Sequence, residues 1–295
     1  MDTIENDRAG AYKKRSKAKS IWKRLLKNKT AVIGLIIFCT LVLTAVFADV
    51  IVDYNSRAIA QDASVRLEAP SASHLFGTDQ YGRDVFARVV HGTRASLTIG
   101  LATVALGMII GSIIGALAGF FGGWSDNVIM RILDIIMSIP PILLALVLVA
   151  VMGAGMMNLM IALAIACFPN FARVTRSVVM PITGQDFIEA ARACGTNNFR
   201  IIFKHVIPNA VGPIIVQGTM AVSKMIIAAA GLSYLGMGIQ PPTPEWGSML
   251  SSAREYMTTS PYLVIIPGLT IVLAALSINL FGDGLRDALD PRLKS

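Results

Sequence analysis

The 295-residue sequence contains few charged residues. Asp, Glu, Lys and Arg make up 15% of it, whereas soluble globular domains contain about 25%. Apolar residues make up 54%, and the mean hydropathy is +0.64. This composition excludes a soluble domain of useful size and indicates an integral membrane protein.

The residue patterns of catalytic and metal sites are also missing. Neither a P-loop, in which two glycines precede Lys and Ser or Thr, nor the glycine fingerprint of a dinucleotide fold occurs in the chain. The three cysteines, Cys39, Cys167 and Cys194, lack metal-ligand spacing, so apolar filling is their expected role. We therefore expect no enzyme activity, no catalytic residue, no metal site and no cofactor bound by this chain.

Long apolar runs dominate the sequence. They lie at residues 30–52, 95–121, 128–152, 156–171, 211–235 and 262–281. A helix that crosses a bilayer needs about 20 residues, within a range of roughly 17–25. Five runs satisfy this, and the fourth reaches the needed length if it starts at Gly153 or continues past Pro169. The expected fold is an all-α integral membrane protein with six transmembrane helices.

The positions of Lys and Arg indicate the orientation. With a cytosolic N-terminus, the inner segments hold 19 of the 26 basic residues and the outer segments hold 6. Because basic residues concentrate on the cytosolic side, both termini are predicted to be cytosolic. Nine basic residues lie between Lys13 and Lys29, immediately before the first run. Such a cluster attracts anionic lipid headgroups, which we favour over nucleic-acid binding.

The predicted organisation follows from these runs. It comprises a cytosolic basic tail (1–29), a first transmembrane anchor (30–52), an extracytoplasmic segment (53–94), a transmembrane core (95–282) with a cytosolic loop at about 172–208, and a cytosolic C-terminal tail (283–295).

A polar insert lies between the fourth and fifth runs. It contains Glu189-Ala190-Ala191-Arg192-Ala193-Cys194-Gly195 and runs on to His205-Val206-Ile207-Pro208. The alanines suit a short helix that Gly195 can end, and Thr196, Asn197 or Asn198 can cap the next helix. We therefore predict a helix-turn-helix that projects into the cytosol.

This insert resembles the coupling loop of bacterial ABC-importer permeases, which reads Glu-Ala-Ala, three residues, Gly, nine residues, then Ile-x-Leu-Pro. His205 and Ile207 depart from this pattern and are similar to the peptide and nickel branch instead. The stretches 75–85, 235–247 and 279–287 also resemble that branch. From about residue 70 onward, the chain is identified as a member of the dipeptide/oligopeptide/nickel permease family, C-type subunit.

The resemblance implies a permease subunit that translocates di- or oligopeptides across the inner membrane of a bacterium. Its implied partners are a second permease in a heterodimer, two cytosolic ATPases that use the ATP, an extracytoplasmic binding protein and membrane lipid, but no nucleic acid. One alternative is a permease of the same family for nickel or another small solute. An ion-coupled secondary transporter is less favoured, because interrupted spans with intramembrane carboxylates would be expected. The binding protein selects the ligand, so the substrate itself stays open.

The resemblance also assigns residues. The ATPase-coupling residues it implies are Glu189, Ala190, Ala191, Arg192, Gly195, Phe199 and Pro208. The alanines leave a smooth helix face that can enter a groove, and the flanking charges can make charge-assisted contacts at its edges. We expect Phe199, Ile202 and Phe203 to anchor the second helix against the membrane domain.

Lys224 lies in the middle of the fifth run, where a charge costs roughly 2.5–3.5 kcal/mol on insertion scales. It should therefore face protein or water. Two interpretations stay open: a residue of the translocation path, or a lysine satisfied by carbonyls or by Gln217 on the same helix face.

Several other patterns give expectations. Four glycines spaced by four residues form a ridge for close helix packing, with a partner that the sequence does not identify: Gly107, Gly111, Gly115 and Gly119. Residues 85–90 have the spacing of an interfacial helix, held by the glycine turns before it. Trp246 suits an interfacial anchor, with a binding-protein contact as the alternative. Arg131 and Asp134 can pair on one helix face.

Methionines are frequent near the start of the fourth run. They are Met152, Met156, Met157 and Met160. A metal path is conceivable in a family that includes nickel importers, but unbranched apolar side chains are the ordinary explanation.

Overall fold

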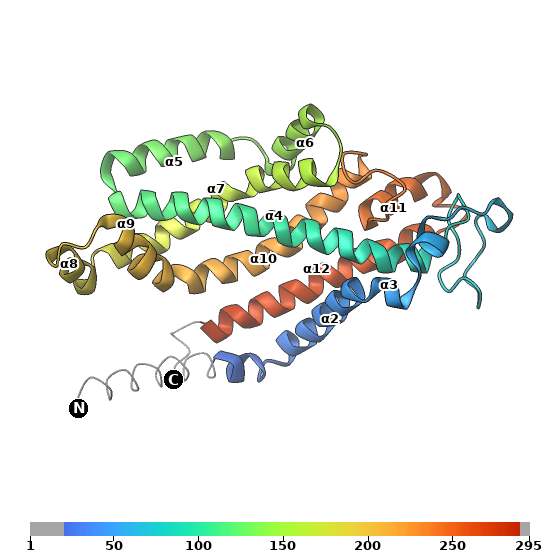
Figure 1. Ribbon diagram of the computed structural model, residues 1–295, viewed down its shortest axis with the longest axis horizontal. Helices are drawn as coiled ribbons and strands as arrows, with labels where there is room; N and C mark the ends of the chain where they lie inside the picture. Colours follow the sequence, from blue (N-terminus) through green and yellow to red (C-terminus); the bar gives the residue numbers. More distant parts are fainter. Residues whose placement is uncertain (1–20, 290–295) are drawn as a thin grey trace.

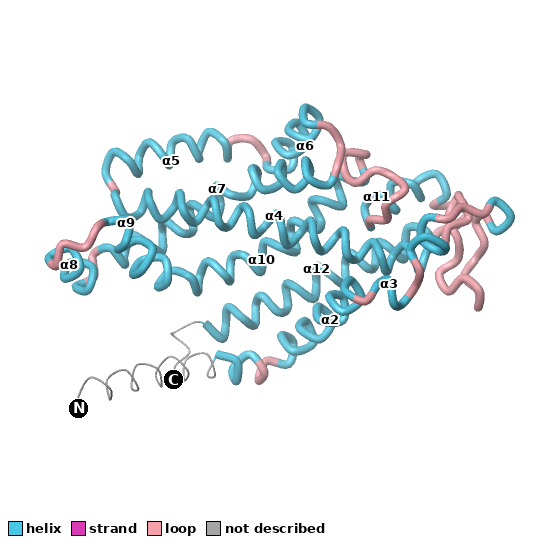
Figure 2. Tube along the Cα trace, viewed as in Figure 1, coloured by secondary structure: helices cyan, strands magenta, loops and turns pink. Residues whose placement is uncertain are grey.

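The computed structural model describes residues 21–289, which form an elongated bundle of helices (Figure 1). Within this range no strand occurs, and the isolated bridge between Thr78 and Asp84 is the extent of β-pairing (Figure 2). The all-α prediction is therefore confirmed. The predictions for residues 1–20 and 290–295 lie outside the described residues.

The helices are α2 (Lys29–Val46), α3 (Ala48–Ile51), α4 (Val85–Phe121), α5 (Gly123–Met137), α6 (Pro141–Met152), α7 (Met156–Thr183), α8 (Asp186–Ala193), α9 (Asn198–Ile201), α10 (Ile207–Tyr234), α11 (Trp246–Ala253) and α12 (Tyr262–Leu289). Short π-helical segments lie at Tyr54–Ile59 and Ile202–Val206, and 3₁₀ turns lie at Ala63–Val65 and Arg254–Tyr256.

Five helical stretches are long and apolar enough to cross a membrane: α2, α4, α7, the continuous stretch Asn198–Tyr234, and α12. The expected third span is instead broken, because α5 and α6 meet at 80°. Pro140 takes an extended conformation and Pro141 opens α6, and neither residue has a backbone N–H to continue α5. The prediction of one continuous third helix was wrong. If the bent pair α5–α6 is taken as one span, the described residues contain six candidate spans, as predicted.

Three helices extend beyond their predicted limits. Helix α4 begins at Val85, so a separate interfacial helix at residues 85–90 was a wrong prediction. Its 37 residues span about 55 Å, more than the roughly 30 Å of a bilayer core. Arg88 and His91, which precede the apolar run, are buried, and their side chains hydrogen-bond to the carbonyl oxygens of Ala58 and Val52. Likewise, α7 runs to Thr183 and α12 to Leu289, into the predicted loop and tail.

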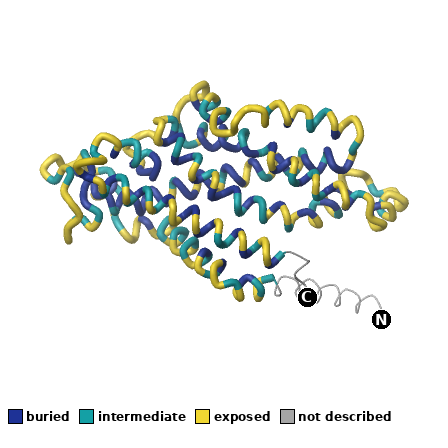
Figure 3. Tube along the Cα trace, turned by 180° about the vertical axis from the view of Figure 1, so that it is seen from behind, coloured by how far each residue is buried: buried dark blue, intermediate teal, exposed yellow. Residues whose placement is uncertain are grey.

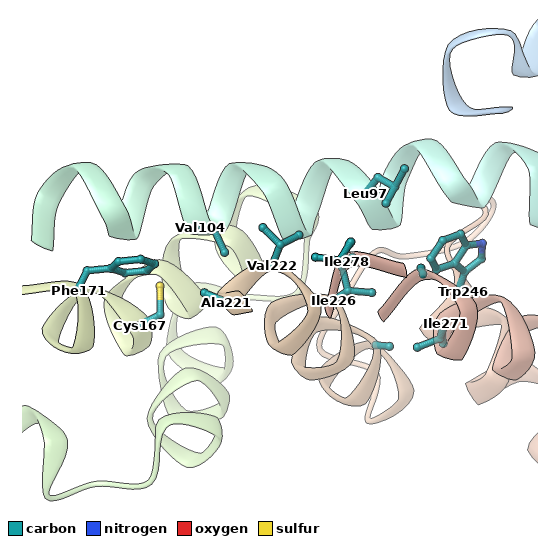
Figure 4. Close-up of a cluster of buried hydrophobic side chains, with 12 residues drawn as sticks. Leu97, Val104, Cys167, Phe171, Ala221, Val222, Ile226, Trp246, Ile271 and Ile278 are labelled. Carbon is teal, nitrogen blue, oxygen red and sulfur yellow. The ribbon is translucent and has the colours of Figure 1, made fainter. Parts of the chain in front are cut away.

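Helices α4, α7, α10 and α12 form the centre of the bundle, and α2 packs on α12 (Figure 1). Leu97 and Val104 on α4 share a buried apolar cluster with Phe171 on α7 and Ile226 on α10 (Figure 4). The cluster also includes residues of α12, so it lies at the contact of four spans far apart in sequence.

The glycine ridge of α4 packs against α7 of the same chain. A Cβ at Gly111 would lie 2.6 Å from Phe171 Cβ, and one at Gly115 would lie 2.9 Å from the Cα and carbonyl carbon of Ala172. Real Cβ atoms essentially never approach within 3.0 Å. The partner that the sequence left open is therefore α7, at a backbone separation only glycine permits.

Two ion pairs fasten α5 to α7. Arg173 donates to Asp134 at 2.7 Å, and Arg176 donates to both carboxylate oxygens of Asp126. Both arginines lie in the part of α7 that extends beyond its predicted end. The predicted pairing of Asp134 with Arg131 was wrong, because its partner comes from another helix.

The segment predicted to be extracytoplasmic (53–94) holds the start of α4. Gly77 and Gly82 take positive φ angles of 75° and 73°, a conformation that favours glycine. Asp79 binds Arg83 at 2.7 Å, and Asp84 caps α4 by accepting a hydrogen bond from the Ala87 N–H at 3.0 Å. These contacts agree with the structural role expected for the glycine turns.

Trp246 lies in the core rather than at a membrane interface. It is 0% exposed, and its Nε1 donates to the Val89 carbonyl oxygen at 3.2 Å. Glu245 caps the same helix, α11, by accepting hydrogen bonds from the Gly247 and Ser248 N–H groups at 2.8 Å each. The interfacial-anchor prediction was wrong, because α11 packs against α4, α10 and α12.

Candidate functional site

The polar insert forms a helical hairpin, here called the docking hairpin (residues 184–206), at one end of the bundle (Figure 1). Its first arm, α8, ends where Gly195 takes a φ of +73°. The Gly195 N–H donates to the Arg192 carbonyl at 2.9 Å, and the Thr196 N–H donates to the Ala191 carbonyl at 3.1 Å. This paired arrangement is a Schellman cap, so the predicted helix end at Gly195 is confirmed.

The second arm of the hairpin is continuous with a transmembrane helix. Asn197, one of three residues predicted to cap it, accepts a hydrogen bond from the Phe199 N–H at 3.0 Å. From α9 the chain passes through the π-helical segment Ile202–Val206 into α10 without leaving a helical conformation. The second arm and α10 therefore form one helical stretch, Asn198–Tyr234.

Buried isoleucines anchor the hairpin to the bundle. Ile188 on α8, with Ile201 and Ile202 on the second arm, packs in a cluster that includes Ala116 and Phe120 of α4 and Val179 and Ile182 of α7. The prediction for Ile202 is confirmed. The sequence analysis did not single out Ile188 and Ile201. The signal for them was an apolar residue within each otherwise polar arm.

Phe199 and Phe203 do not anchor the second arm. Their side chains are 58% and 57% exposed, so that prediction was wrong for both. Phe187 on α8, which was not singled out from the sequence, is also exposed. The hairpin thus presents three phenylalanines outward, although large apolar side chains are normally buried.

The residues assigned to ATPase coupling lie together on this hairpin and on the first turn of α10. Glu189, Ala190, Arg192 and Gly195 are exposed, as are Phe199 and Pro208, while Ala191 is half-buried. Exposed residues predominate at this end of the bundle (Figure 3). The Arg192 guanidinium lies 5.1 Å from the centroid of the Phe120 ring. The outer face of α8 therefore combines small side chains with two charges of opposite sign.

A second candidate site is a cavity of about 530 Å³ between the α5–α6 bend, α7 and α10. Its walls are mostly apolar. The residues that line it are Ile136, Met137, Ile139, Pro141, Ile142, Leu144, Leu163, Ala166, Cys167, Asn170, Lys224, Met225 and Ala228.

Lys224 and Asn170 are the strongly polar side chains of this cavity. Both are exposed, and neither forms a hydrogen bond or ion pair with any other residue between positions 21 and 289. Gln217 lines a different cavity and does not bind Lys224. Asn170 was missed, because an amide inside an apolar run carries no charge signal.

The methionines do not gather at one site. Met156 and Met160 pack in an apolar cluster, whereas Met152 and Met157 are exposed. Among the described residues, no group of three or more His, Cys, Asp or Glu residues is placed to hold a metal ion. The side chains therefore agree with the apolar interpretation.

Comparisons with known proteins place this geometry in a family. Residues 111–295 match the family described as "Binding-protein-dependent transport system inner membrane component", and residues 16–70 match the "N-terminal TM domain of oligopeptide transport permease C". The chain also resembles a methionine ABC transporter solved in an inward-facing conformation, with 20% identity and a TM-score of 0.56 over 70% of this chain and 97% of that one. That likeness concerns the fold alone.

Curated relatives match at higher identity. The dipeptide transport system permease protein DppC of Alkalihalophilus pseudofirmus is 45% identical over 93% of this chain and 90% of its own. The di/tripeptide transport system permease protein DppC of Pseudomonas aeruginosa is 44% identical over 95% and 94%. The glutathione transport system permease protein GsiD of Pectobacterium atrosepticum is 43% identical over 94% and 92%.

The family match covers more than half of the chain, and each relative is matched over nine-tenths of its length. The chain therefore belongs to the inner-membrane permeases of binding-protein-dependent ABC importers, as a C-type subunit of the dipeptide and oligopeptide branch.

Proposed function

We propose that this permease subunit translocates short peptides. In support, the relatives described above are named for dipeptides, di- and tripeptides, and glutathione, itself a tripeptide. The observation that carries the proposal is the continuity of the docking hairpin with α10, which also lines the cavity at Lys224. One helix thus joins the surface suited to a motor protein with the space suited to a solute.

The same cavity makes nickel a poorer candidate. No Asp, Glu or His lines it, and its one cysteine, Cys167, is buried. A divalent metal ion is normally held by several such ligands. Lys224 would repel a cation, and two unit charges about 4 Å apart repel by about 4 kcal/mol at an effective dielectric constant of about 20. A zwitterionic peptide avoids this penalty because its carboxylate can face the lysine.

The proposed complex contains a second, different permease. Helix α10 has a stripe of exposed or half-exposed residues, spaced alternately by four and three positions. These are Pro213, Gln217, Met220, Lys224, Ile227, Gly231 and Tyr234. A stripe with this spacing suits packing against another helix along its length. A partner on this face would close the cavity and place Lys224 between the two subunits.

The complex also contains two cytosolic ATPases and an extracytoplasmic binding protein. The family consists of transport permeases, so we assign ATP binding and hydrolysis to the ATPases and no cofactor to this chain. ATP binding would draw the ATPases together and displace the docking hairpin. Because the second arm continues into α10, that displacement would switch the cavity between inward-open and outward-open states.

The orientation places both termini in the cytosol. The start of α2, the end of α12 and the docking hairpin lie at one end of the bundle, and α11 lies at the other (Figure 1). The excess of basic residues in the sequence lies in the segments predicted to be cytosolic, which supports a cytosolic position for the hairpin. This is the arrangement required of a permease in the inner membrane whose motor is cytosolic.

Docking can be tested by charge reversal. We expect Glu189→Lys to lower the amount of ATPase that co-purifies with the permease and to lower substrate-stimulated ATP hydrolysis by about tenfold, the effect of a lost charge-assisted contact. Ala190→Phe should act similarly by widening the narrow helix face. Both side chains are exposed, so folding should be preserved.

The matched control is Glu255→Lys, the same charge reversal at an exposed position near the opposite end of the bundle. It should leave ATPase co-purification unchanged. Wild-type co-purification and hydrolysis in both hairpin variants would show that α8 is not the docking element.

A further inference from the structure

We infer that Lys224 and Asn170 form a binding site for the C-terminal carboxylate of the transported peptide. This inference rests on the proposed function and names the chemical group that the cavity recognises. Both side chains line one cavity but come from different helices, α10 and α7.

The first argument is the lack of partners for these side chains. The Lys224 ammonium offers three donors and the Asn170 amide offers two, and neither is engaged by any residue in the described chain. Polar groups at membrane depth are retained when they face protein or a water-filled path. Both groups line the cavity, so their donors are available to a solute that enters it.

The second argument concerns the sign of the charge. Lys224 brings one positive charge to a wall that is otherwise apolar, and no carboxylate lines the cavity to neutralise it. An ammonium and an amide N–H₂ are both donors, so the group they suit is an anionic acceptor with two oxygens. Every unmodified short peptide carries one such group, at its C-terminus, whatever its side chains.

The third argument is position. Lys224 lies ten residues before the end of α10 at Tyr234, which corresponds to about 15 Å along the helix. That is about half the thickness of a bilayer core, so a lipid headgroup would not reach it. The cavity volume of about 530 Å³ lies within the roughly 300–1,000 Å³ typical of ligand pockets. A short peptide is therefore a better occupant than a lipid phosphate.

The test compares a dipeptide with its C-terminal amide, which lacks the carboxylate. Initial uptake rates are measured for alanyl-phenylalanine and alanyl-phenylalanine amide, with the assembled complex in proteoliposomes and saturating binding protein. The binding protein has its own preference, but it is the same for every permease variant. The ratio of acid to amide uptake, compared between variants, therefore isolates the contribution of the permease.

We expect Lys224→Met to lower the ratio of acid to amide uptake by about tenfold, the effect of losing a hydrogen bond to a charged group. Lys224→Arg should keep the ratio within about threefold of wild type, because the charge and donors remain. Asn170→Leu should lower the ratio by about threefold to tenfold, as expected for a weaker neutral donor. Ile227→Val, on the same face of α10 but outside the cavity, should leave the ratio unchanged.

If the wild-type complex does not take up the dipeptide amide, the uptake ratio is undefined and a second measurement is needed. Asn170→Cys, in a background with the native cysteines replaced by serine, is labelled with a thiol reagent. Free dipeptide should slow the labelling, and the amide should not.

Equal loss of acid and amide uptake in Lys224→Met, or an unchanged ratio, would overturn the inference while leaving peptide transport intact. Equal protection by acid and amide in the labelling experiment would do the same. An assembled wild-type complex that takes up neither form would instead overturn the proposed function, and this inference with it.

Discussion

The contact between α2 and α12 allows a stringent test of helix packing. Gly284 on α12 is buried against Ala31 on α2. A Cβ added at Gly284 would overlap the Cβ of Ala31, whereas the next nearest atom, Ala31 Cα, would lie at 3.4 Å. Gly284→Ala therefore creates one overlap between methyl groups and no clash with backbone atoms.

The magnitude follows from this geometry. Overpacking by one methyl group costs about 1–3 kcal/mol, and the better helix propensity of alanine offsets up to about 1 kcal/mol. Ala31→Gly alone loses a buried methyl group, about 0.8 kcal/mol, and about 1 kcal/mol of helix propensity. In the double variant the methyl group moves from α2 to α12 without overlap. The double variant should therefore be more stable than the sum of the single effects by about 1–3 kcal/mol.

The assay is the thermal unfolding midpoint of the purified complex in detergent. At roughly 2–4 °C per kcal/mol for a chain of a few hundred residues, Gly284→Ala should lower the midpoint by several degrees, and Ala31→Gly should restore most of that loss. Gly115→Ala is the control that Ala31→Gly should not rescue, because its clash is with the backbone of Ala172. Gly268→Ala, with no atom within 4 Å, should not lower the midpoint. Additive effects of Gly284→Ala and Ala31→Gly would refute the packing of α2 on α12.

Two further predictions concern topology and a buried carboxyl group. An impermeant thiol reagent applied to intact cells should label Ser71→Cys and leave the exposed Cys194 unlabelled, and the reverse pattern would contradict the proposed orientation. Burial raises the pKa of Glu245, which is 1% exposed, above its ordinary value, so the folded state holds this proton more tightly than the unfolded state does. Wild type should therefore lose stability relative to Glu245→Gln as the pH rises from about 5 to about 8, and parallel midpoints across that range would argue against a raised pKa.

Features that depend on near neighbours in the chain were predictable. Gly195 ends α8 and Asn197 caps the second arm through contacts that span at most five residues. The glycine ridge Gly107–Gly119 predicted close helix packing, because its spacing places four small residues on one helix face. The family was also visible, since the Glu189 motif and the apolar runs are properties of short stretches.

The misses have different causes. Taking residues 128–152 as one apolar run hid the break at Pro140 and Pro141, although proline was a local signal for it. The exposed Phe199 and Phe203 were assigned to the core because large apolar side chains are normally buried there. On a docking surface, an absent partner can supply that burial instead.

The sequence by itself determined the membrane class, the family, the end of α8 at Gly195 and the cap of the second arm at Asn197, because each depends on composition or on residues within a few positions. Only the tertiary structure decided the partners of residues distant in the chain. Asp134 binds Arg173, 39 residues away, and Trp246 binds Val89, 157 residues away. Asn170 faces the same cavity as Lys224 only because α7 and α10 pack together. Such contacts depend on which helix faces pack together. The residue pattern of one helix does not specify which face of which other helix will contact it.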